Sequence, residues 1–507
     1  MGNVAIFAVF FVLLASFAIS VWSARKRSSD RLQDFLFAGN TPLLALSSCI
    51  GSIISMAVSF TALLSAGYVW GWQMIFPMIA GSLAGLFAIL KVSDHPQVAA
   101  HEQRIERGSF VYGASYLAIV DSRAKMAYYG FILAGYTAML ITEIVVLRTF
   151  IGFVTGLPAY ELLLTIATIL MVCYAYVYIG GFRGVLVTDY FQLLVVFVFV
   201  GLWLTAISFR TAMDIPAPTV SRLSFMPFTR VLLHSGIFAG AFAWTFASTD
   251  QWYRTLGTLR RAAAKQVLKS STVALCTFAI VPILAGAAAI ARPDVPSSMT
   301  NGISLFLVAH LLTDANVTLR FVFAMALTCA GLTTLNTYIM TMQQLYYEAS
   351  TRIDSKHWLH YLLIKYPLKW KSVRGFVAVL TGAAFVASSY FPERYVYAFG
   401  VLSLSCFILV LPFVTAALFE VLSGSRRRVI AAVAASAARR LLDRGAVTIG
   451  TAAVAWIAFL CLARYAIGPL TLHLYAIPAA AFAAALCGAI FTLFLRPAPK
   501  ETMHEAR

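Results

Sequence analysis

Charged residues are scarce in this chain of 507 residues. They make up 11% of it, whereas hydrophobic residues make up 61%. Soluble domains carry roughly 25% charged residues, so this balance excludes a soluble globular protein and indicates one that crosses a membrane many times. The net charge of +18 does not indicate nucleic-acid binding, because the basic residues lie in short clusters between apolar runs, as in cytoplasmic loops of membrane proteins.

Cysteine and histidine are also few. The seven cysteines all lie within apolar runs and form no Cys-x-x-Cys pair, which excludes a disulfide framework or a thiolate metal site. The eight histidines show no metal-ligand spacing. No nucleophile or nucleotide motif is present either, so the sequence does not predict an enzyme. Residues 4–22 lack a preceding basic residue and a cleavage site, and are expected to be a retained helix rather than a signal peptide.

What the chain does contain is a series of about thirteen apolar segments, each suited to crossing a bilayer as a helix. They cover residues 4–22, 44–68, 72–90, 126–154, 162–178, a sixth segment from about 187, 231–247, 267–291, 320–348, 375–390, 395–422, 447–462 and 474–494. If these cross alternately, roughly 30 of the 38 Lys and Arg fall on one side. This asymmetry predicts a bacterial inner-membrane protein with a periplasmic N-terminus and a cytoplasmic C-terminus.

Two of the segments contain residues that break helices. Gly51 and Ser52 stand in the middle of the second segment, and the seventh contains Gly236 and Gly240 before a polar end. Such residues persist within a membrane only where other protein groups satisfy the freed backbone. Because the two segments lie five spans apart, they predict an all-α transporter built from a 5+5 inverted repeat, with its binding site near the midplane.

The predicted organisation has three parts. Residues 1–40 supply an extra helix and a cytoplasmic loop, and residues 41–425 form the ten-helix core. The two repeats of the core cover about 41–210 and 228–425. Residues 426–507 supply two further helices and a short cytoplasmic tail.

The ninth segment, 320–348, carries an unusual run of hydroxyl groups. Thr333, Thr337 and Thr341 recur every four residues and therefore share one helix face, next to the small Ala330 and Gly331. Oxygen atoms gathered on one face suit a hard cation that prefers oxygen ligands. The alternative is that these hydroxyls bond to the preceding turn or to a neighbouring helix.

Four motifs resemble those of the sodium/solute symporter family. They are DFLFAGN at 34–40, GGFRGVLVTDYFQ at 180–192, DQWYR at 250–254 and AGLTT at 330–334. Their order and spacing agree over about residues 1–425, which makes the combination far more specific than any single motif. The resemblance implies the leucine-transporter-like fold and uptake of a small organic solute across the bilayer, with Na+ as the coupling ion and a monomer sufficient for function.

The resemblance also implies ion ligands. One sodium ion would be held by the carbonyls of Gly51, Ile54 and Ala330 and by the hydroxyls of Thr333 and Thr334. The positions of a second sodium ion, or of an exit path, are Asp189, Asn336 and Thr337, together with Thr333. A carboxylate in the membrane needs a cation or a proton, but Asp189 could instead cap the start of the sixth segment.

The chain departs from the family pattern at several positions that concern the substrate. Ile53 stands where the family often has a polar residue, and Asn40 stands where arginine is usual. The run Ser248-Thr249-Asp250 replaces the Asn-Gln of the family's sugar carriers, so the sequence does not indicate a sugar as substrate. The residues expected to line the substrate cavity are Gln73, Glu143, Trp244, Ser248 and Thr249. Glu143 could meet a cationic substrate or carry a proton. Alternatively, Glu143 and Arg148 could form a structural ion pair, or Arg148 could extend its side chain to the outer surface.

The sequence thus predicts a sodium-coupled secondary active transporter that works by alternating access. Two alternatives share the fold: a membrane sensor with a transporter-like domain, and a symporter driven by protons through Glu143 or Asp189. No nucleic-acid partner is expected.

Overall fold

A computed structural model describes residues 2–25, 32–37, 40–55, 61, 63–93, 122–211, 227–247, 249–289, 317–352, 370–390, 396–411, 436–437, 440–441, 444–467 and 476–494. Within these ranges the secondary structure is entirely helical.

The helices follow the predicted segments closely. They are α1 (Gly2–Arg25), α2 (Leu32–Phe37), α3 (Pro42–Ile53), α4 (Leu64–Trp70), η2 (Trp72–Met74), α5 (Ile75–Ser93), α7 (Ser122–Thr155), α8 (Ala159–Thr211), α9 (Pro227–Ala247), α10 (Thr249–Arg254), α11 (Arg261–Ala289), α13 (Val317–Arg352), α15 (Trp370–Tyr390), α16 (Val396–Leu409), α19 (Gly445–Ile467) and α20 (Ala476–Phe494). In the described part of the chain, seven helical stretches are long and apolar enough to cross a membrane. The predicted all-α polytopic fold is confirmed.

The predicted interruption of the second segment is present, whereas α9 of the seventh segment continues as a helix through Gly236 and Gly240. The second segment contains α3 and α4. Thr41 caps the start of α3, Pro42 occupies its first turn, and the helix ends at Ile53. The seventh segment consists of α9, which ends at Ala247, and the short buried helix α10. The fifth and sixth segments form the two halves of α8, which meet at a sharp kink where Gly181 has φ +61°.

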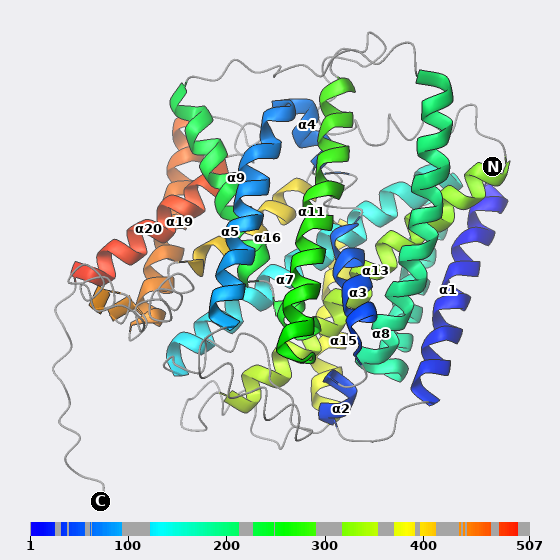
Figure 1. Cartoon of the computed structure of the whole chain (residues 1–507), viewed down its shortest axis with the longest axis horizontal. Helices are drawn as coiled ribbons and strands as arrows, with labels where there is room; N and C mark the ends of the chain where they lie inside the picture. The colour runs from blue at the N-terminus through cyan, green and yellow to red at the C-terminus, as the bar shows by residue number, and fades with distance from the viewer. Residues whose placement is uncertain are drawn as a thin grey trace, which may run out of the picture.

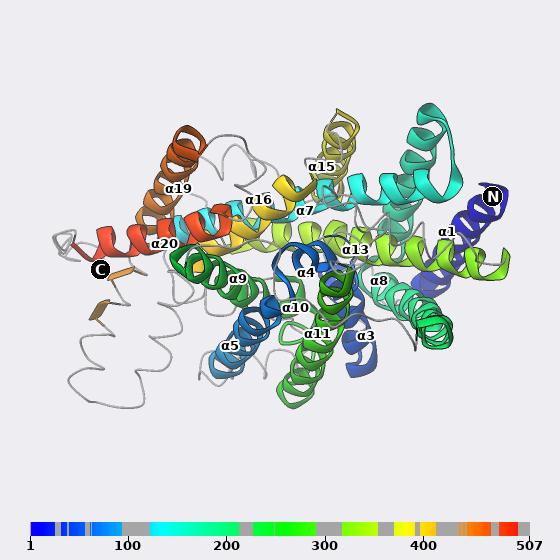
Figure 2. The same cartoon turned by 90° about the horizontal axis from the view of Figure 1, so that it is seen from above.

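Helix α13 lies in the middle of the bundle. It packs against α8, α7, α1, α15, α3 and α10, whereas α5 packs on α9 and α11 packs on α4. Figure 1 shows α1 and α8 at one end of the molecule and α19 and α20 at the other, and Figure 2 shows the same arrangement from above. The interrupted helix α3 is therefore held against the central helix.

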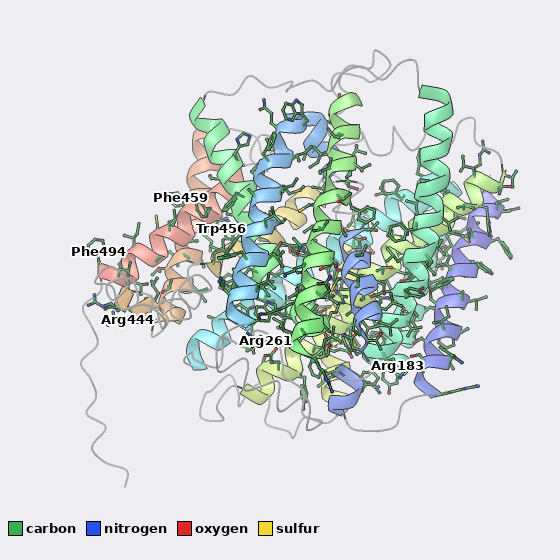
Figure 3. All side chains as sticks on the ribbon, in the orientation of Figure 1. Arg183, Arg261, Arg444, Trp456, Phe459 and Phe494 are labelled. Carbon is green, nitrogen blue, oxygen red and sulfur yellow. The ribbon has the colours of Figure 1, made fainter. Side chains whose placement is uncertain are left out.

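Basic residues at three helix turns lie toward the same side of the bundle. Figure 3 labels Arg183, just after the kink of α8, Arg261, at the start of α11, and Arg444, just before α19. This placement agrees with the alternation of basic loops from which the membrane orientation is predicted.

Candidate ion-binding site

The broken helix α3 meets the central helix α13 at Gly51 and Thr333. A β-carbon added to Gly51 would lie 2.7 Å from Thr333 Cγ2, so any larger residue at this position would force the Thr333 methyl group or the two helices to shift. Gly51, Ile54, Ala330, Thr333 and Thr334 are all buried. The structure thus brings together the two helix segments that carry the five predicted sodium ligands.

The backbone of α3 leaves helical geometry beside this contact. Ile54 caps the helix with φ −82° and ψ 52°, and its N–H donates to the carbonyls of Gly51 (3.1 Å) and Ile50 (3.3 Å). Carbonyls at a helix end lose the regular donors of the next turn and retain lone pairs for other partners. Ile54 and the carbonyls of the last α3 turn are therefore suited chemically to ligate a cation.

The threonine hydroxyls of α13 bond back to carbonyls in the preceding helical turn. The sequence allowed this role as the alternative to ion binding. The hydroxyl of Thr334 donates to the carbonyl of Ala330 (2.9 Å), and that of Thr333 lies 2.9 Å from the carbonyl of Cys329. Because a hydroxyl has one proton and two lone pairs, donating the proton to the helix leaves its oxygen able to face a cation. The back-bonds and a role in ion binding are compatible.

Thr333 has a second partner on α8. Its hydroxyl lies 2.7 Å from Oε1 of Gln192, whose amide nitrogen donates to Ser16 of α1 (3.0 Å). Its methyl group faces Gly51. Thr333 therefore joins α3, α8 and α13 at one point.

A second buried cluster surrounds Asp189. One carboxylate oxygen accepts from the hydroxyl of Ser48 on α3, and the other accepts from the amide nitrogen of Asn336 on α13 (3.0 Å). Asp189 lies well inside α8, and these partners come from two other helices. The alternative that Asp189 caps a helix start is therefore wrong.

The short helix α10 brings an arginine to the same region. Arg254 Nη1 lies 2.8 Å from Asp250 Oδ2, and Nη2 donates to the hydroxyl of Thr337 (2.6 Å). The other oxygen of Asp250 accepts from the hydroxyl of Tyr136 on α7 (2.8 Å). All four side chains are buried. The interaction links α7, α10 and α13 through one continuous polar chain.

Sequence reasoning missed several members of these clusters. Ser48, Gln192, Asp250 and Arg254 lie within the quoted motifs or the serine-rich second segment, and their polarity in apolar surroundings was the available signal. Tyr136 carried no such signal, because a single tyrosine in an apolar helix is ordinary. Its role becomes visible only through its contact with Asp250.

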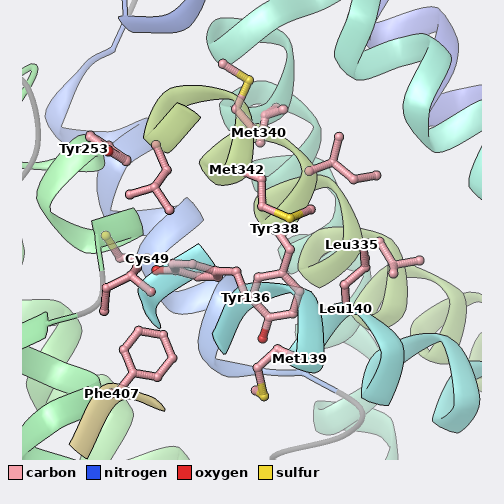
Figure 4. Packing of buried hydrophobic residues seen from close by; sticks show 14 of the residues in the cluster. Cys49, Tyr136, Met139, Leu140, Tyr253, Leu335, Tyr338, Met340, Met342 and Phe407 are labelled. Carbon is pink, nitrogen blue, oxygen red and sulfur yellow. The ribbon is translucent and has the colours of Figure 1, made fainter. Parts of the chain in front are cut away.

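The predicted substrate residues do not all come together. Thr249 Oγ1 lies 3.5 Å from the hydroxyl of Tyr136, and the ring of Trp244 lies 5.2 Å from that of Phe407. Phe407 in turn packs edge-on against Tyr136 (Figure 4). Thr249 and Trp244 therefore border one aromatic cluster formed by α7, α9, α10 and α16.

The other predicted substrate residues lie elsewhere or outside the description. Glu143 is buried on α7. Gln73 is on η2, which packs against α4, α5 and α11. Ser248 lies outside the described residues. Arg148 donates to the carbonyl of Ser388 (2.7 Å), which ties α7 to α15 and gives Arg148 a structural role.

Comparisons with known proteins agree on the architecture. No protein-family profile and no curated protein sequence matches the chain. Among solved structures it is similar to a Na+-coupled sialic acid symporter in a substrate-bound outward-open state, with 14% identity, 97% of this chain and 98% of that chain covered, and a TM-score of 0.57. It is also similar to a manganese transporter of Eremococcus coleocola, with 14% identity, 91% and 99% coverage, and a TM-score of 0.52. The chain therefore has the leucine-transporter-like fold.

Proposed function

We propose that the protein is a sodium-coupled symporter of a small organic solute, related to the sodium/solute symporters. The observation that carries the proposal is the contact between Gly51 and the methyl group of Thr333, where the end of an interrupted helix meets the helix that carries the predicted hydroxyl ligands. The sialic acid symporter that shares the fold is Na+-coupled, which supports the same ion here.

The proposed site gives sodium a mechanical role. A sodium ion in a low-dielectric site needs several oxygen atoms in place of its water. Carbonyls of Gly51, Ile54 and Ala330 and hydroxyls of Thr333 and Thr334 would supply them from two helices that otherwise share only a narrow contact. Binding the ion would hold α3 against α13, and releasing it would allow them to part.

Coupling follows from the preference of the ion for one conformation. A gradient drives transport only if sodium binds one state more tightly than the other. In our proposal sodium stabilises the arrangement with α3 docked on α13, which forms the substrate site beside the aromatic cluster of Tyr136, Trp244 and Phe407. Thr249, at the start of α10, would contact the solute there.

The membrane orientation is part of the proposal. The side of the bundle that holds Arg183, Arg261 and Arg444 would face the cytoplasm, because basic loops are retained on that side of bacterial inner membranes (Figure 3). The N-terminus would then lie in the periplasm and the C-terminus in the cytoplasm.

Transport in proteoliposomes tests the proposal. A thermal-shift screen of amino acids, small organic acids and vitamins, each with and without sodium chloride, would first identify a stabilising solute. Uptake of that solute, radiolabelled, is then compared with an inward sodium gradient, an inward proton gradient and no gradient. We expect accumulation with the sodium gradient only.

Matched variants connect the sodium response to the site. Thr334→Ala removes a proposed ligand, whereas Thr328→Ala removes a buried hydroxyl with the same back-bond, to Ala324 (2.8 Å), on the same helix. We expect the first to lose sodium-driven uptake and the second to retain it. Uptake driven by protons alone would identify a proton symporter, and binding without uptake under any gradient would identify a sensor.

A further inference from the structure

We propose that Arg254 occupies the place of a second sodium ion, so that the transporter binds a single sodium ion per molecule. This inference rests on the proposed sodium-coupled function and concerns the cluster around Asp189, Asn336 and Thr337. Two prospective ligands of a second ion in that cluster already accept from donors of the protein itself: Thr337 from Arg254, and Asp189 from Ser48 and Asn336.

Thr337 is engaged by the guanidinium group. Its hydroxyl oxygen accepts from Arg254 Nη2 at 2.6 Å, and both residues are buried. A hydroxyl offers its lone pairs to a metal ion or to a donor of similar charge, and the guanidinium group already supplies that positive charge. Arginine keeps its charge at every physiological pH, so this cation is permanent.

Arg254 is fixed in this position by its own helix and by neighbouring elements. Asp250, one turn earlier on α10, holds Nη1 at 2.8 Å and is itself held by the hydroxyl of Tyr136. The side chain of Asn40 donates to the backbone carbonyl of Arg254 (2.6 Å). A buried charge pair with these additional hydrogen bonds is costly to break, because removing either partner leaves the other uncompensated.

Asp189 and Asn336 satisfy each other. Asn336 directs its amide nitrogen, a donor, toward the carboxylate of Asp189, whose other oxygen accepts from Ser48. An ionised carboxylate can only accept, so this orientation of the Asn336 amide follows from the chemistry of its partner. Asn336 therefore turns its donor toward Asp189, while its amide oxygen lies 3.4 Å from the hydroxyl of Thr337.

Thr333 completes the set. Its hydroxyl lies between the carbonyl of Cys329 and the side-chain oxygen of Gln192, at 2.9 and 2.7 Å. Thr333 belongs to both predicted ion sites, and its hydroxyl oxygen can ligate one ion in the site between α3 and α13. The carboxylate of Asp189, held by Ser48 and Asn336, would attract that ion along its way out without holding another.

Counting bound ions tests this inference. Equilibrium binding of radiolabelled sodium to purified wild-type protein, calibrated by protein concentration, gives the number of ions per molecule without any solute. We expect one ion per molecule, lost in Thr334→Ala and retained in Asp189→Asn and in Thr337→Val. The last two variants keep the shape of the cluster and remove a prospective ligand of a second ion.

The possible outcomes separate the inference from the function on which it rests. If the wild type binds two ions and both Asp189→Asn and Thr334→Ala bind one, the proposed role of Arg254 is overturned. That result would leave sodium coupling intact. An absence of sodium binding in correctly folded wild-type protein would overturn both proposals. A single ion that disappears in Asp189→Asn but remains in Thr334→Ala would place sodium in the cluster that we assign to Arg254.

Discussion

Gly51 of α3 lies directly against the methyl group of Thr333 on α13, at a spacing that a side chain at position 51 could adopt only if its surroundings shifted. This contact joins the interrupted helix to the one that carries the hydroxyl groups. It explains why the helix-breaking residue stands in the middle of an apolar segment, where a glycine would otherwise weaken the helix. The predictions below concern this contact and the interactions that hold α3 in place.

Gly51→Ala should weaken sodium binding. The new methyl group would lie 2.7 Å from Thr333 Cγ2, so Thr333 or α3 must shift, and either change disturbs the proposed site. A loss of about 1.4 kcal/mol corresponds to about a tenfold weaker sodium affinity, and we expect at least that. Gly130→Ala is the control, because a β-carbon at Gly130 meets no atom within 4 Å. Equal sodium titrations of the two variants would contradict the prediction.

Gly181→Ala should destabilise the protein at the kink of α8. Gly181 has φ +61°, which side chains disfavour, and an added β-carbon would lie 2.7 Å from Phe35 of α2. Gly156→Ala separates these effects, because Gly156 has φ +66° and open space around it. We expect about 1 kcal/mol of destabilisation from the backbone alone at Gly156 and clearly more at Gly181. Unfolding temperatures in detergent measure both, and a smaller loss at Gly181 would refute the proposed contact with α2.

Asn40→Ala should loosen the start of α3. The amide nitrogen of Asn40 donates to the carbonyl of Arg254 and to the hydroxyl of Thr258 (2.7 Å), and so ties the chain before α3 to the turn after α10. Losing both bonds should cost about 1–3 kcal/mol, since it leaves buried acceptors without that donor. Thr165→Ala, which removes an exposed back-bond, is the control. Unfolding temperatures that fall equally in both variants would show that the link carries no stability.

Arg374→Ala should detach the short helix α2. The Arg374 guanidinium lies 4.7 Å from the ring centre of Phe35 on α2 and 3.5 Å from that of Tyr178 on α8, and Nη2 donates to the Tyr178 carbonyl (2.9 Å). Cation–ring contacts contribute about 0.5–1 kcal/mol each at exposed sites.

A control for Arg374 is available in the chain. Lys91 lies 5.4 Å from the ring of Phe87, its neighbour on α5, and joins no separate elements. Limited proteolysis before α3 should accelerate in Arg374→Ala and remain unchanged in Lys91→Ala. Unchanged cleavage in both would show that Arg374 does not anchor α2.

The sequence was sufficient for features that depend on local composition. Hydropathy located the helices, and Gly51 marked the break after α3. Features that depend on contacts between distant helices could not be predicted from one sequence. The pairing of Arg254 with Thr337 joins residues 83 positions apart, and that of Tyr136 with Asp250 joins residues 114 apart. Gln73 illustrates the same limit, since its polarity was visible but its position on η2 was not.

The central claim is that a sodium ion binds between α3 and α13, and sodium titration of the unfolding temperature tests it most directly. Ligand bound only to the folded state stabilises it by about 1.4 kcal/mol for each tenfold rise in concentration above Kd. The account predicts a sodium-specific rise, with potassium chloride holding ionic strength constant, and a midpoint shifted by about tenfold or more in Thr334→Ala but not in Thr328→Ala. A Thr334→Ala titration that coincides with the wild type, or stabilisation by potassium equal to that by sodium, would contradict it.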